Sequence, residues 1–270
     1  HVEVPNRDEF GRLTVNLNRT STRLATLYND LTELNENLEK TIEEQLAQLR
    51  RAEQLRRYLA PQVADAVLSG GGSVGLASTR RNLTILFADI RGFTSMAERM
   101  EPEELIDSLN QYFTAMTDVV FRHGGTLDKY VGDGILAFFG DPIPFEDHAE
   151  RAVATAFEMR HELDALRGTW LLERGEDLNV GIGISTGYVT VGNIGSTTRT
   201  EYTVIGNHVN LASRLATIAQ PQQILVAERT LVAVRDQVEA NPVDEISLKG
   251  VNRPIRIFEI ASTTADLPDA

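Results

Sequence analysis

Asp89 stands where a carboxylate could hold a divalent metal ion. It follows the apolar, β-branched run 82–87, which predicts a strand, and it precedes a glycine-containing turn at 90–94. A carboxylate at a strand end, beside backbone N–H groups, can bind Mg²⁺ and leave room for phosphate oxygens. An aspartate in this position is more often a helix cap, so Asp89 alone decides nothing.

Asp133 lies between two glycines, and the runs 126–130 and 134–139 on either side predict a β-hairpin. Gly-Asp-Gly is a common turn, so a turn residue is the simplest interpretation of Asp133. A hairpin tip beside the Asp89 strand would bring two carboxylates together, a familiar arrangement for two metal ions in displacement at phosphorus. Like charges at close range are unfavourable unless a cation lies between them, so the pair predicts a metal site.

Asn210 and Arg214 form a third candidate group. They are four residues apart on the predicted helix 209–219, so their side chains share one face. A solvated polar face is the interpretation that this spacing favours by itself.

The elements that must position these residues alternate between strands and helices. Helix 102–123 begins with a proline and ends at two glycines, and helix 147–166 follows the hairpin. Further strands are predicted around the turn Thr186-Gly187 and near the C-terminus, at 179–185, 188–194, 223–226 and 255–260. The order is mixed rather than a strict parallel series, so we predict an α+β fold with helices packed on a sheet.

A single long helix without Pro or Gly is predicted over 20–59. Its leucines recur in steps of three and four, the seam of a coiled coil, at Leu24, Leu27, Leu31, Leu34 and Leu38. The apolar pattern continues with a stutter at Ile42, Leu46 and Leu49. We predict a parallel dimer helix that carries a signal; the alternative is an amphipathic helix packed on its own domain. Pro61, a short helix at 62–68 and a flexible joint at 69–79 would follow.

Composition narrows the class of protein. The 270 residues suit one domain with an appendage, or two small domains. The net charge of −13 makes nonspecific binding to nucleic acid unfavourable, so an anionic substrate would need metal ions and locally placed Lys or Arg. The absence of cysteine excludes disulfides and thiol catalysis, and no apolar run reaches the ~18 residues that span a bilayer.

Three stretches, 87–94, 127–139 and 201–215, together resemble the catalytic domain of the class III nucleotidyl cyclases, the adenylate and guanylate cyclases. They occur in the order typical of that family. The resemblance covers 80–262 and leaves 263–270 as a tail. It implies a ferredoxin-like nucleotidyl cyclase core that works as a head-to-tail homodimer, with active sites at the interface.

The resemblance also implies a role for each candidate residue. Asp89, Asp133 and the Ile90 carbonyl would hold two Mg²⁺ or Mn²⁺ ions per active site. Asn210 would orient the ribose, and Arg214 would neutralise charge on the reacting phosphate. The phosphate-binding residues would be Gly92, Phe93, Thr94, Lys249 and, in a looser alignment, Arg199.

Two further positions set the choice of base in this family, and here they are Lys129 and Thr203. Lys with Asp or Thr is similar to the adenylate cyclase pattern, and the Thr form is typical of one bacterial branch; guanylate cyclases carry Glu with Cys or a similar small residue. Lysine donates to adenine N1, and a hydroxyl can accept from the 6-amino group. The implied reaction converts ATP to 3′,5′-cyclic AMP and pyrophosphate. A guanylate cyclase and a noncatalytic nucleotide-binding signalling module are the alternatives.

The stretch 8–13 resembles the start of the second helix of HAMP linkers, a membrane-adjacent signalling module. It implies that 1–20 is the end of such a linker and that 21–68 carries a signal to the catalytic domain. The parent would then be a membrane-anchored bacterial protein whose upstream sensor segment is missing here, and this fragment would be its cytoplasmic part.

Overall fold

The computed structural model describes residues 9–58, 78–196, 200–246 and 254–263. The chain divides into two compact units, 1–58 and 59–270. Pro61, the predicted short helix and most of the predicted joint lie outside the described residues, so these predictions stay predictions.

The helix α1 (Glu9–Tyr58) is the described part of the first unit. It has 50 residues, so the predicted long helix is confirmed, and it begins earlier than expected. The leucines of the predicted seam, from Leu24 to Leu38, are each more than half exposed, and the apolar stripe continues at Ile42 and Leu46. Pairing of α1 with a second helix stays a prediction. No helix in the described ranges combines the length and the apolar character needed to cross a membrane.

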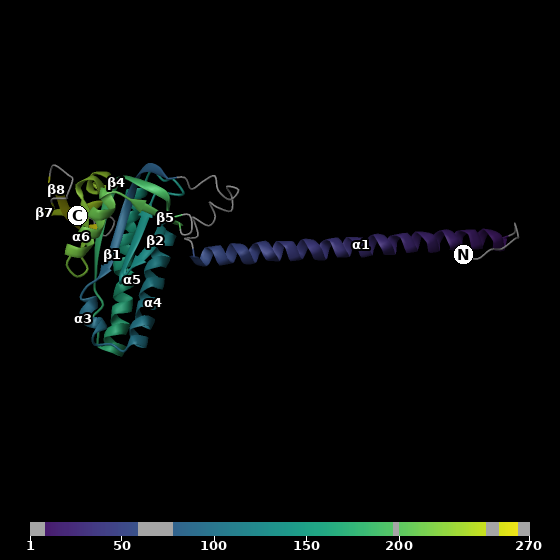
Figure 1. The fold of residues 1–270 in the computed structure, drawn as a ribbon, viewed down its shortest axis with the longest axis horizontal. Helices are drawn as coiled ribbons and strands as arrows, with labels where there is room; N and C mark the ends of the chain where they lie inside the picture. The colour runs from purple at the N-terminus through teal and green to yellow at the C-terminus, as the bar shows by residue number, and fades with distance from the viewer. Residues whose placement is uncertain (1–8, 59–77, 197–199, 247–253, 264–270) are drawn as a thin grey trace, which may run out of the picture. The chain divides into compact units, whose positions relative to one another are not determined.

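The second unit is built on a mixed sheet (Figure 1). Its strands within the described residues are β1 (Thr79–Ile90), β2 (Thr126–Val131), β3 (Gly134–Phe139), β4 (Val180–Gly195), β5 (Thr200–Ile205), β6 (Ile224–Ala227), β7 (Val238–Ile246) and β8 (Ile255–Thr263). The order is β2-β3-β1-β4-β6-β8-β7, with β5 also paired to β4. Neighbours are antiparallel except β4 and β6, which are parallel. This arrangement confirms the predicted α+β fold.

Helices pack on both faces of the sheet. They are α3 (Phe93–Ala97), α4 (Pro102–Arg122), α5 (His148–Arg174), α6 (Asn207–Ile218) and α7 (Glu228–Val234). Alternate residues of β1 reach opposite faces: Leu86 and Ala88 join the core formed with α4 and α5. Leu83 and Ile85 join a smaller core with Ala212 of α6. Burial on both faces explains why residues 83–88 of β1 form an almost continuous apolar run.

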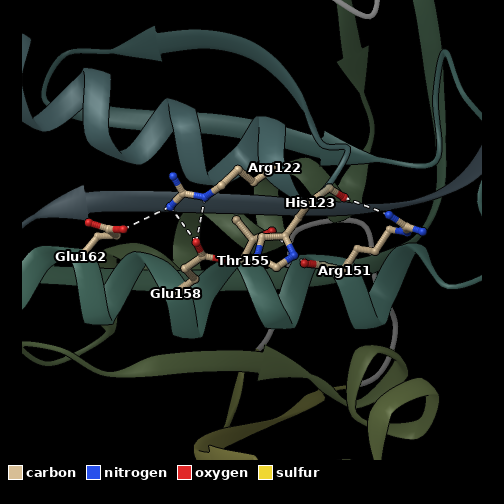
Figure 2. Close-up of polar contacts among 6 residues, drawn as sticks. All are labelled: Arg122, His123, Arg151, Thr155, Glu158 and Glu162. Carbon is tan, nitrogen blue, oxygen red and sulfur yellow. Dashed lines mark hydrogen bonds and ion pairs between the residues drawn. The ribbon is translucent and has the colours of Figure 1, made fainter.

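The helices α4 and α5 lie side by side and are joined by polar contacts at their surface (Figure 2). Arg122 at the end of α4 contacts Glu158 at 2.6 Å and Glu162 at 3.2 Å, both on α5. The ring of His123 also bonds to Glu158, and Arg151 donates to the His123 carbonyl at 3.4 Å. These contacts tie the chain that leads into β2 to α5. An open groove of about 570 Å³ between the two helices contains none of the candidate residues.

Thr186-Gly187 is not a turn, and this prediction is wrong. The two residues lie inside the single 16-residue strand β4, where Gly187 pairs with Leu83 of β1. A Cβ on Gly187 would lie 2.0 Å from Nε2 of His208. The glycine therefore makes room for that ring inside a strand, and its presence in an apolar run does not mark a chain reversal.

Three elements have no counterpart in the sequence prediction: β5, α7 and β7. Most of β7 is exposed, and its residues include Pro242 and four polar or charged side chains. Such a sequence is a weak strand signal, but β7 is the last strand of the sheet, and an edge strand tolerates a proline because its N–H groups need no partner on the open side.

Candidate active site

The end of β1 and the tip of the β2–β3 hairpin bring Asp89 and Asp133 together. The strands β1 and β3 are antiparallel neighbours with Ala88 opposite Ile135, which places the hairpin turn beside Asp89. A Cβ on Gly134 would lie 3.3 Å from Asp89 Oδ1, so only glycine fits there without displacing a neighbour. The backbone N–H of Ile90 lowers the pKa of the Asp133 carboxyl, so this carboxylate lies near the end of β1. The juxtaposition predicted from the hairpin is therefore present.

The electrostatics of this end suit a cation. Burial raises the pKa of Asp133, and the negative charge of Asp89 raises it further, whereas the Ile90 N–H and the Arg91 guanidinium lower it. Arg91 also forms an ion pair with Asp89 and donates to the Thr217 carbonyl at 2.7 Å, so it links the metal end to α6. Carboxylate oxygens are the donors that Mg²⁺ and Mn²⁺ prefer. Across the described residues no group of three or more His, Cys, Asp or Glu could hold a metal ion.

The predicted phosphate-binding stretch follows at once. Gly92 has φ 71°, the left-handed region that favours glycine, and its carbonyl accepts the Met96 N–H at 3.1 Å to start the short helix α3. Phe93 packs against the main core, whereas Thr94 is exposed. The backbone of this turn thus lies next to the two aspartates. Lys249 and Arg199, the other predicted phosphate ligands, lie outside the described residues.

The two predicted base-selecting residues are linked by a residue that the sequence did not single out. Lys129 lies on β2, with Nζ 2.6 Å from Glu201 Oε2 and 3.5 Å from Asp128 Oδ1. Thr203, on β5, donates through Oγ1 to Asp128 Oδ2 at 2.6 Å. Burial raises the pKa of Asp128, and the bonds from Thr203, Lys129 and Val204 oppose that rise. A charged pair inside an otherwise apolar hairpin is the sequence signal that could have pointed to Asp128.

Asn210 and Arg214 lie on α6, one turn apart, as predicted. Both are exposed, because the opposite side of the helix is buried through Leu211, Ala212, Leu215 and Ala216. The helix therefore presents the pair to its outer surface, where a second molecule could reach them.

Comparison with known proteins identifies relatives of this chain. A family model described as "Adenylate and Guanylate cyclase catalytic domain" matches residues 76–262. An adenylate cyclase from Anabaena cylindrica is 33% identical over 262 residues, 94% of this chain and 48% of that protein. Adenylate cyclase 1 from Rhizobium meliloti is 29% identical over 75% of this chain and 31% of its own length.

The chain belongs to the adenylate and guanylate cyclase catalytic domain family. Two solved cyclase structures agree with this assignment. The adenylyl cyclase CyaB from P. aeruginosa has a TM-score of 0.67 and is 39% identical, covering 72% of this chain and 100% of that chain. The guanylyl cyclase Cya2 has a TM-score of 0.67 and is 42% identical, covering 71% and 97%.

Membership in the cyclase family confirms the predicted resemblance and the predicted cyclase core. It does not choose the base, because an adenylyl and a guanylyl cyclase match the chain about equally well. The chain spans 48% and 31% of the length of the two curated cyclases above. The HAMP-like start, the domain boundaries and the roles of the site residues stay predictions.

Proposed function

We propose that this chain is an adenylate cyclase, which converts ATP to 3′,5′-cyclic AMP and pyrophosphate. The observation that supports it is the pairing of Lys129 and Thr203 through Asp128. An ammonium donor beside a hydroxyl acceptor is complementary to N1 and the 6-amino group of adenine. The same pair is a poor match for guanine, whose N1 and 2-amino groups are donors and whose C6 carries an acceptor.

The remaining residues act on the triphosphate and the ribose. Asp89, Asp133 and the Ile90 carbonyl would hold two Mg²⁺ or Mn²⁺ ions, which when bound supply positive charge to the triphosphate and favour deprotonation of the ribose 3′-hydroxyl. Arg214 stabilises charge that develops at the α-phosphate, while Asn210 orients the ribose for in-line attack. The phosphate chain is held by the backbone of Gly92, Phe93 and Thr94 and by Lys249 and Arg199.

We further propose that two copies of the chain share each active site. The metal ligands would come from one subunit, and the base-binding residues with Asn210, Arg214 and Lys249 from the other. The exposure of Asn210 and Arg214 on α6 supports this arrangement. The exposed leucine stripe of α1 supports pairing of two such helices, because a parallel coiled coil would bury it.

The long helix would then regulate the enzyme by setting how the two half-sites meet. The 1–20 stretch would be the end of a HAMP-like linker and 21–68 the signalling segment, within a membrane-anchored bacterial protein whose catalytic part is cytoplasmic. The noncatalytic alternative is disfavoured because a degenerate cyclase would be expected to lack a metal aspartate or the Asn–Arg pair, and this chain has all four residues.

The test is a cyclase assay on the 270-residue chain with Mg²⁺ or Mn²⁺ and either ATP or GTP. We expect cyclic AMP from ATP and a much lower kcat/KM for GTP. Specific activity should fall on dilution as the dimer dissociates, and removal of residues 1–60 should shift that fall to higher protein concentration. No cyclic nucleotide from either substrate contradicts the enzymatic proposal, and a preference for GTP establishes the guanylate cyclase alternative.

A further inference from the structure

Asp128 lies at a bulge in β2. Leu127 and Lys129 oppose Ala137 and Leu136, which are consecutive on β3, so Asp128 has no partner in the register of these two strands. In a regular strand, neighbouring side chains point to opposite faces. The bulge relaxes that alternation, and the Asp128 carboxylate lies 3.5 Å from the Lys129 ammonium although only 1% of its side chain is exposed.

The two oxygens of the buried carboxylate differ, because within the described residues Oδ2 accepts hydrogen bonds and Oδ1 has an ion-pair contact but no hydrogen-bond partner. Its Oδ2 accepts from the Thr203 hydroxyl at 2.6 Å and from the Val204 backbone N–H at 3.3 Å. Its Oδ1 faces the ammonium of Lys129. A proton on Oδ2 would oppose the Val204 N–H, and a proton on Oδ1 would oppose Lys129. The geometry therefore favours the ionised carboxylate, which can only accept.

We propose that Asp128 is a positioning residue that sets purine specificity through Thr203. The Thr203 hydroxyl carries one hydrogen, and the ionised carboxylate takes it. Only lone pairs remain on Oγ1, so it accepts from the 6-amino group of adenine and cannot donate to the 6-oxygen of guanine. Two facing acceptors repel, which disfavours GTP. This inference rests on the proposed function, in which Lys129 and Thr203 meet the base; Asp128 itself touches no substrate.

Asp141 offers a matched control in the same region. It is also buried, at 4% exposed, and it forms an ion pair with Arg81 at 2.9 Å. Its other oxygen accepts from the hydroxyl of Tyr202, the residue that precedes Thr203 on β5. The two aspartates thus anchor adjacent residues of one strand, but only Asp128 contacts the residues proposed to select the base.

The test compares kcat/KM for ATP and for GTP in the wild-type 270-residue chain and three variants, with thermal unfolding measured on each. Asp128→Leu fills a similar volume but accepts nothing, so Thr203 can turn its hydrogen toward the base. We expect the ATP-to-GTP ratio to fall tenfold or more. Asp128→Asn keeps an oxygen for Thr203 and Val204 and should retain most of the ratio. Asp141→Asn should lower the unfolding temperature and leave the ratio unchanged.

Thr203→Val completes a double-mutant cycle with Asp128→Leu. It removes the hydroxyl while keeping the shape, so the ATP-to-GTP ratio should fall in this variant as well. Asp128→Leu should then cause no further change in the ratio when Thr203 is already valine. A merely structural Asp128 would lower both kcat/KM values by one factor, and that result, or additive losses in the ratio, would overturn the inference.

Inosine triphosphate gives a readout on the wild-type chain if Asp128→Leu does not fold. It carries the 6-oxygen of GTP without the 2-amino group, so the wild type should reject it about as strongly as GTP. Efficient use of inosine triphosphate overturns the inference. A wild type inactive on every nucleotide overturns the proposed function and this inference with it. Wild-type preference for ATP with an unchanged ratio in Asp128→Leu overturns this inference alone.

Discussion

Asp128 and Asp133 lie five residues apart on one hairpin, in opposite surroundings. Burial raises the pKa of both carboxyls. Asp128 is surrounded by donors: the Thr203 hydroxyl, the Val204 N–H and the Lys129 ammonium. Asp133 has the Ile90 N–H but also faces a second carboxylate, that of Asp89.

These surroundings show which half of the site is organised by the chain alone. The base end is organised by contacts within the protein, so its geometry needs no ligand. The metal end keeps two carboxylates close together. Arg91 pairs with Asp89, but burial and the charge of Asp89 still raise the pKa of Asp133, so a divalent cation between the carboxylates should be favourable. The base end should therefore fix the choice of substrate, whereas the metal end should govern turnover and respond to metal concentration.

Asp133→Asn should have the largest effect on activity. The amide removes a charged metal ligand and disturbs charge stabilisation worth several kcal/mol, so we expect kcat/KM for ATP to fall by roughly 10²–10³-fold. The residual ATP-to-GTP ratio should be unchanged because the base end is intact. Asp107→Asn, an exposed carboxylate on α4, is the control and should leave activity as it is.

The effect of Asp133→Asn on stability can be measured separately by thermal unfolding. Because the pKa of Asp133 is raised in the folded chain, its contribution to stability is full at acid pH and is lost as pH rises through that raised pKa. Without metal at neutral pH, Asp133→Asn should therefore unfold no lower than wild type. Mn²⁺ should raise the unfolding temperature of wild type only. An equal Mn²⁺ shift in both proteins would contradict the metal assignment.

Lys129→Met should show the converse pattern. Methionine keeps the length of the side chain but cannot donate, and loss of a charged hydrogen bond of about 1.5–3 kcal/mol lowers kcat/KM for ATP roughly 10–100-fold. The Mn²⁺ shift in unfolding temperature should persist. Lys129→Glu adds a third carboxylate beside Asp128 and Glu201, so it should also lower stability. Loss of the Mn²⁺ shift in Lys129→Met would show that the two ends are not separable.

Gly134→Ala should disturb the metal end more gently. The added Cβ would lie 3.3 Å from both Asp89 Oδ1 and the Ala88 carbonyl, so the carboxylate must shift. We expect the Mn²⁺ concentration for half-maximal activity to rise by roughly fivefold, equivalent to about 1 kcal/mol. Gly132→Ala is the control, because its Cβ would meet nothing within 4 Å and the change acts only through a φ of 64°. Equal metal requirements in the two variants would rule out contact with Asp89 as the cause.

The metal end and the base end of the site differ in how much of their structure the sequence could predict. The approach of Asp133 to Asp89 follows from a hairpin whose tip lies beside a strand end, and both features are visible as apolar runs around glycines. The positions of these two residues along the chain were enough to predict their approach, because the strands β1 and β3 beside them pair in a regular register. The exposed pair on α6 was likewise predictable from helical spacing.

The charged pair at 128–129 marks this part of the hairpin in the sequence, but the contact of Asp128 with Thr203 could not be predicted, because it depends on a bulge. A regular β2 would have put Asp128 and Lys129 on opposite faces, and no feature of the sequence marks which residue is extra. The predicted turn at Gly187 was wrong for a related reason. The space that a Cβ would need there is filled by His208, and this contact forms only when α6 packs on β4. Local patterns predict regular elements, whereas irregular positions are set by long-range packing.

Tyr112→Phe should have the smallest effect and tests whether the metal end has a donor hidden in the core. Tyr112 is fully buried on α4, and within the described residues its hydroxyl has no hydrogen-bond partner. Burial raises its pKa, and the charges of Asp89 and Asp133 add to that rise, so the hydroxyl lies within their field.

Because removal of an unpaired hydroxyl forfeits no bond, we expect stability to change by less than about 1 kcal/mol and activity by less than about twofold. Tyr130→Phe is the matched control: its hydroxyl is 2.9 Å from Thr117 Oγ1, so calorimetry should show a loss of about 0.5–1.5 kcal/mol. A fall in activity of more than about tenfold in Tyr112→Phe, with stability intact, would mean that this hydroxyl serves the aspartates. The metal end would then contain a hydroxyl donor in addition to Arg91, and the contrast with Asp128 would be one of degree.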